Sequence, residues 1–117
     1  MAEYLIAFND EWVPEHTDDE LRAKSEALQP LLAEMRDAGV LIFTGGLDDG
    51  APVFSVDASS GTPVFTDGPY AETKEHLGGF AVVDVADEEA ARHWAGRIAI
   101  ACGWPQQVHS FRRRLRR

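Results

Sequence analysis

Short apolar runs alternate with amphipathic segments along the chain, and the two patterns predict strands and helices. Three runs are apolar without regular polar alternation, which is typical of strands covered on both faces, and they span residues 4–8, 40–44 and 79–85. Two further runs, 53–56 and 62–66, predict a hairpin at the sheet margin, where Pro63 fits an edge strand. Residues 107–111 predict a final strand.

The two amphipathic segments predict helices with recognisable ends. The first begins after Thr17, which with Glu20 has the spacing of a capping box, and it stops at Gly39. Pro30 inside this segment is expected to kink the helix or divide it. Asp87 is the expected N-cap of the second helix. The order of elements predicts a ferredoxin-like α+β fold, an antiparallel sheet with two helices on one face and an added hairpin.

Two helices shield only one face of such a sheet, yet its predicted strands are apolar on both faces. Burying about 500 Å² of the remaining apolar surface contributes on the order of 10 kcal/mol before the costs of association. We therefore expect a homodimer in which a second copy packs on the uncovered face.

Charge is distributed unevenly along the 117 residues, whose formal net charge is −9. We expect one domain over residues 1–111 and a disordered arginine-rich tail over 112–117. Five of the eleven basic residues lie in this tail, namely Arg112, Arg113, Arg114, Arg116 and Arg117. The rest of the chain carries 6 basic and 20 acidic residues, a net charge of −14, which disfavours binding to nucleic acid or anionic membrane. Besides being disordered, the tail has two alternatives. It could contact the acidic body of the protein, or it could bind an acidic partner or nucleic acid.

The single cysteine, Cys102, has no partner for an internal disulfide, and the first residues lack a basic n-region. Both features favour a cytoplasmic protein. No apolar run approaches the length of a membrane span. The four histidines share no ligand spacing, so we expect neither a metal site nor a cofactor.

Turn-forming and ionisable residues concentrate just before the strand over 79–85. Residues 67–75 read Asp-Gly-Pro-Tyr-Ala-Glu-Thr-Lys-Glu, and residues 77–80 read Leu-Gly-Gly-Phe. This combination resembles the YCII-related superfamily, in particular the branch named for its Asp-Gly-Pro-Phe motif, with Tyr70 in place of phenylalanine. The resemblance extends from the first strand to Val108, and it implies a dimeric α/β barrel.

Asp67 stands before Gly68 and Pro69, which predict a stiff turn. Its carboxylate either acts as a base beside a cleft between sheet and helices or only binds backbone N–H groups of the turn. Some superfamily members resemble dehydrohalogenases or lactone isomerases and use a His–Asp pair, in which the carboxylate orients the imidazole. His16, just before the first helix, is the local candidate for that histidine.

Four more residues are candidates for binding a ligand. Tyr70 is expected to form a wall of the cleft, while Glu72 and Lys74 form either its polar lip or a solvated loop. His109 alternates with Val108 on the last strand and is a candidate to face the cleft. The remaining histidines, among them His76, are expected at the surface.

Two hypotheses for function follow. The favoured one is a non-catalytic dimeric module, with a ligand-binding or regulatory role and a small-molecule cleft beside Asp67. The alternative is a cofactor-independent lyase or isomerase, similar to a dehydrohalogenase or muconolactone isomerase, in which Asp67 is the acid or base.

Overall fold

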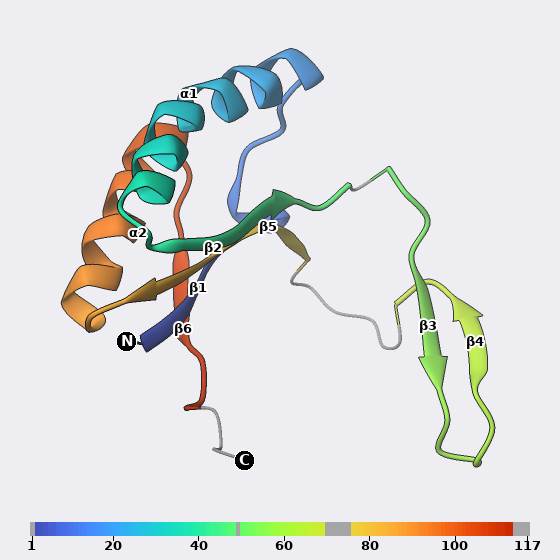
Figure 1. Cartoon of the computed structure of the whole chain (residues 1–117). Coiled ribbons are helices and arrows are strands. Elements are labelled where there is room, and N and C mark those ends of the chain that lie inside the picture. The colour runs from blue at the N-terminus through green and yellow to red at the C-terminus, as the bar shows by residue number, and fades with distance from the viewer. Residues whose placement is uncertain (1, 49, 70–75, 114–117) are drawn as a thin grey trace.

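A computed structural model of the chain describes residues 2–48, 50–69 and 76–113 (Figure 1). The main sheet consists of β1 (Ala2–Asn9), β2 (Leu41–Gly46), β5 (Leu77–Val85) and β6 (Gln107–Ser110). Its spatial order is β2-β5-β1-β6, and all neighbouring strands are antiparallel. This order is that of a ferredoxin-like fold, so the predicted α+β class is confirmed.

The helices α1 (Asp18–Asp37) and α2 (Glu88–Cys102) both lie on one face of this sheet (Figure 1). Thr17 and Glu20 form the predicted capping box at the start of α1. The helix continues through Pro30 and is not divided there. The Asp87 carboxylate accepts a hydrogen bond of 2.9 Å from the Ala90 N–H, which confirms the predicted N-cap of α2. No helix in the described ranges is long and apolar enough to cross a membrane.

The hydrophobic core lies between the sheet and the two helices. Its largest fully buried side chains are Ile6, Met35, Val83 and Val85. Ile6 pairs with Ala81 in the β1–β5 register, so these residues face the same side. Alternation along the strands then determines which residues face away from the helices.

We call the side of the sheet away from the helices the open face, and its apolar residues are Leu5, Ala7, Phe43, Phe80 and Val82. Phe43 is 58% exposed, and its ring centroid lies 5.9 Å from that of Phe80. Neither helix packs against this face within the described ranges (Figure 1). One chain therefore forms an open sheet rather than a closed barrel. The dimeric barrel requires a second copy and stays a prediction.

The predicted hairpin forms from β3 (Phe54–Asp57) and β4 (Val64–Asp67), but its expected place at the margin of the main sheet is wrong. The two strands form a separate sheet that projects from the body, which we call the arm (Figure 1). The sequence pattern predicts that the two strands pair, but it does not determine whether the pair joins another sheet. The radius of gyration is 16.5 Å. A compact domain of this length is expected to have about 13 Å.

Candidate functional site

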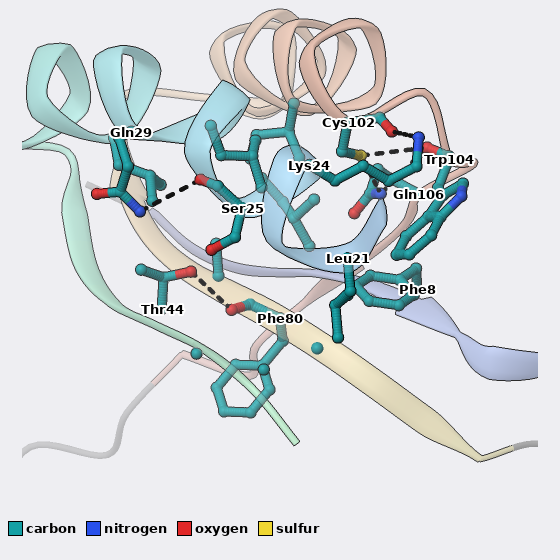
Figure 2. A pocket seen from close by; sticks show the side chains of 18 of the residues that line it. Phe8, Leu21, Lys24, Ser25, Gln29, Thr44, Phe80, Cys102, Trp104 and Gln106 are labelled. Atoms are coloured by element: carbon teal, nitrogen blue, oxygen red, sulfur yellow. Dashed lines mark hydrogen bonds between the residues drawn. The ribbon is translucent and has the colours of Figure 1, made fainter. Parts of the chain in front are cut away.

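A cavity of about 360 Å³, which we call the α1 cavity, opens between α1 and the helix-covered face of the sheet (Figure 2). The segment that follows α2 closes one end of it. The lining residues with apolar side chains or none are Ile6, Phe8, Leu21, Leu28, Leu32, Gly45, Gly46, Gly79, Phe80, Ala81, Ile98, Cys102 and Trp104. The polar and charged ones are Lys24, Ser25, Gln29, Arg36, Thr44 and Gln106.

The cavity exists because the sheet beneath α1 carries small side chains. Gly46 pairs with Gly79 and Thr44 pairs with Ala81, so the part of the floor formed by β2 and β5 holds no large side chain in these two rows. A Cβ atom added at Gly79 would lie 2.9 Å from the Phe8 ring, so a larger residue there would displace this wall. The phenyl ring of Phe80 projects to the other side of β5, and only its backbone borders the cavity (Figure 2).

One end of the cavity is aromatic and holds an amino group. Trp104 is buried, and its ring centroid lies 5.1 Å from that of Phe8. The Lys24 Nζ atom lies 5.0 Å from the centre of the Trp104 ring and donates a hydrogen bond of 2.5 Å to the Cys102 carbonyl. Because Cys102 is the last residue of α2, the ammonium group also complements the negative end of this helix. Gln106 is held here as well, since its side-chain amide donates to the Trp104 carbonyl at 3.1 Å.

The other end is more polar and lies toward the C-terminal half of α1 (Figure 2). The Thr44 hydroxyl donates a hydrogen bond of 3.0 Å to the Phe80 carbonyl. Gln29 donates to the Ser25 carbonyl, and Arg36 stands in the last turn of the helix. These groups suit a ligand with an apolar body and a few hydrogen-bonding atoms.

The sequence-predicted site residues do not gather in this cavity. Asp67 is exposed at the end of β4, opposite Phe54 in the arm, and it does not line the cavity. Tyr70, Glu72 and Lys74 lie outside the described residues. The cleft beside Asp67 therefore stays a prediction.

The two predicted histidines lie apart from each other. His16 contacts the Trp104 ring, with 5.0 Å between the ring centroids, and its Nδ1 atom lies 3.1 Å from the Pro14 carbonyl oxygen. It stands at the outer side of the aromatic end without lining the cavity. His109 pairs with Leu5 and so belongs to the open face, on the other side of the sheet from the cavity. No hydrogen bond in the described part of the chain joins either histidine to Asp67.

A histidine–carboxylate pair is present at another place, which sequence reasoning missed. The Nδ1 atom of His76 is hydrogen-bonded to the Glu11 carboxylate, which also accepts a 2.9 Å hydrogen bond from the His76 backbone N–H. These hydrogen bonds lower the pKa of the Glu11 carboxyl below its ordinary value. The two residues meet because the end of β1 lies beside the start of β5, where the Asp10 N–H donates to the His76 carbonyl. No spacing signal in the sequence marks a pair that is 65 residues apart.

Comparison with known families identifies the domain. A family model described as the YCII-related domain matches residues 3–102. The chain belongs to the YCII-related family. No curated protein matches it. The match runs from β1 to the end of α2, so the YCII-related domain includes every wall of the α1 cavity except Trp104 and Gln106. Membership of the Asp-Gly-Pro-Phe branch stays a prediction.

Proposed function

We propose that this YCII-related domain is a ligand-binding or regulatory module that takes a small organic molecule into the α1 cavity. The observation that carries the proposal is the cavity itself, with its volume of about 360 Å³, apolar floor and few polar groups. Ligand sites in proteins commonly enclose about 300–1,000 Å³ and have this mixed character. A ring of benzene size with one polar substituent fits such a volume.

A substitution that fills the cavity tests this function. Ser25 lines the cavity and is itself exposed to solvent rather than part of the core. Ser25→Trp therefore places an indole in the cavity without disturbing the core. Ala33→Trp is the matched control, because Ala33 is exposed on the same helix and does not line the cavity. We expect saturation-transfer NMR to detect benzoate or benzamide bound to wild type and Ala33→Trp, but not to Ser25→Trp. Equal binding to all three proteins would refute the assignment of the site.

The domain is further proposed to work as a homodimer. The open face exposes Phe43, and the arm exposes Phe54 and Phe65 to 68% and 67%. An isolated two-stranded hairpin is marginally stable in water, so contacts with a second copy would stabilise the arm as well as cover the sheet. Analytical ultracentrifugation at micromolar concentration is expected to give a dimer.

Charge placed on the open face tests which surface forms the dimer. Phe43→Lys is expected to produce monomers. Ile100→Lys, on the opposite side of the molecule where Ile100 is 85% exposed on α2, should leave the dimer intact. A wild-type monomer, or equal effects of the two substitutions, would contradict the proposed interface.

The second candidate function is a cofactor-independent lyase or isomerase with Asp67 as acid or base. The observation that favours acid–base chemistry is the Glu11–His76 pair, because a carboxylate on Nδ1 orients the ring and leaves Nε2 for proton transfer. Deuterium exchange beside the carbonyl of a small lactone measures such chemistry. Under this function Asp67→Asn and His76→Asn abolish exchange, while His93→Asn, at an exposed histidine of α2, does not. Under the binding function Asp67→Asn changes no activity and costs about 1 kcal/mol of stability.

A further inference from the structure

The charge of the α1 cavity is opposite to that of the protein around it. The chain has 20 acidic and 11 basic residues. The described residues that line the cavity nevertheless include Lys24 and Arg36 and no aspartate or glutamate. A cavity lined according to the average composition of this chain would be acidic. The composition therefore does not explain why the charged lining residues of the α1 cavity are basic.

The arginines on the two helices outside the cavity are paired with carboxylates. Their ion pairs are Arg22–Asp19 at 3.5 Å, Arg92–Glu88 at 3.2 Å, and Arg97–Glu34. In the described ranges neither Lys24 nor Arg36 has such a partner. Among the described residues, the two helix cations that border the cavity are thus the ones that form no ion pair with a carboxylate.

Lys24 is better placed than Arg36 to hold a ligand anion beside an apolar group. An ammonium group has three N–H donors, and the Cys102 carbonyl takes one of them. The Trp104 ring covers one side of the Nζ atom, and Phe8 packs against that ring. Arg36 is twelve residues farther along α1, about 18 Å away at 1.5 Å per residue, so one small ligand does not reach both cations.

We infer that the α1 cavity takes a small organic acid, with its carboxylate on Lys24 and its apolar part against Phe8 and Trp104. This assignment rests on the proposed binding function and adds the chemical class of the ligand. Lys24 provides the charge-assisted hydrogen bonds, which are the stronger ones when the surroundings are partly apolar.

A pair of probes that differ only in charge tests the inference. Benzoate and benzamide have nearly the same size, and their dissociation constants can be measured by NMR titration in one buffer. For wild type we expect benzoate to bind about tenfold more tightly than benzamide, because hydrogen bonds to a charged group are the stronger ones. This preference should weaken as salt is added.

Substitutions of Lys24 show whether its charge is responsible. Lys24→Met is expected to bring the ratio of the two dissociation constants to about one, and Lys24→Arg to retain most of the preference. Arg22→Met, which removes a paired charge on α1 outside the cavity, should leave the ratio unchanged. The ratio of the two dissociation constants within one variant does not depend on the folded fraction. Any destabilisation from losing the hydrogen bond between Lys24 and the Cys102 carbonyl therefore does not obscure the result.

The failures of the two proposals are distinguishable. Benzamide binding as tightly as benzoate to wild type, with both blocked by Ser25→Trp, would overturn the anion preference and leave the binding function standing. A preference for benzoate that survives Lys24→Met would overturn the role of Lys24. No binding of either probe at millimolar concentration would overturn both the proposed function and its ligand class.

Discussion

Truncation of two α1 side chains should cost different amounts of stability, because one side chain lies in the close-packed core and the other borders the α1 cavity. Met35 is fully buried against the sheet and does not line the cavity, whereas Leu28 is only partly buried and forms part of its wall. Met35→Ala leaves a new void in close-packed surroundings, so we expect a loss of about 2–5 kcal/mol of unfolding free energy. Leu28→Ala enlarges a space that already exists, and at about half burial its lost methylene groups amount to about 1 kcal/mol.

These energies correspond to measurable melting temperatures. An unfolding entropy of about 2.1 cal/mol/K per residue over 117 residues gives a shift of about 4 °C for each kcal/mol. Met35→Ala should therefore melt about 8–20 °C lower than wild type, and Leu28→Ala about 4 °C lower. Circular dichroism melts at one fixed protein concentration provide the test, since dimerisation makes the midpoint depend on concentration. Equal shifts for the two variants would refute the difference in packing between Met35 and Leu28. They would also contradict the presence of the α1 cavity beside Leu28.

Three further predictions concern the local structure around the site. Thr17→Ala removes the capping box of α1 and should cost about 1 kcal/mol in a denaturant titration, with Thr17→Ser as the control that keeps the cap. Glu11→Gln should lower the melting temperature at neutral pH. Since the pKa of Glu11 is lowered in the folded protein, its stabilising effect is present above its ordinary value of 4.5 and is lost as the pH falls below it, so melts of the two proteins should converge in acid. Gly78→Ala should destabilise the fold and perturb the Phe8 ring in NMR spectra, because the added Cβ would lie 2.5 Å from that ring; an unchanged Phe8 signal would show that the contact is absent.

Local sequence patterns predicted most of the secondary structure. Apolar runs predicted three strands of the main sheet, and residues 107–111 predicted the fourth. The side chains of Thr17 and Asp87 predicted where the helices begin. These features depend on neighbours within a few residues, so the chain order alone contains them.

Long-range contacts decided the position of the candidate site. Lys24 is an ordinary polar residue of an amphipathic helix in the sequence, and it becomes part of a site only where α1 crosses Trp104 and the end of α2. Glu11 and His76 likewise meet only because the β1 and β5 ends are adjacent.

The sequence by itself determined the elements of this YCII-related domain, their caps and their order, because periodicity and capping are local properties of the chain. Only the tertiary structure decided that the arm stands apart from the main sheet and that His109 faces away from the helices. It also decided that small residues such as Gly46 and Ala81 form the part of the floor beneath α1 that β2 and β5 contribute, which leaves room for a cavity. Each of these depends on strand register and helix placement, which join residues far apart in the chain.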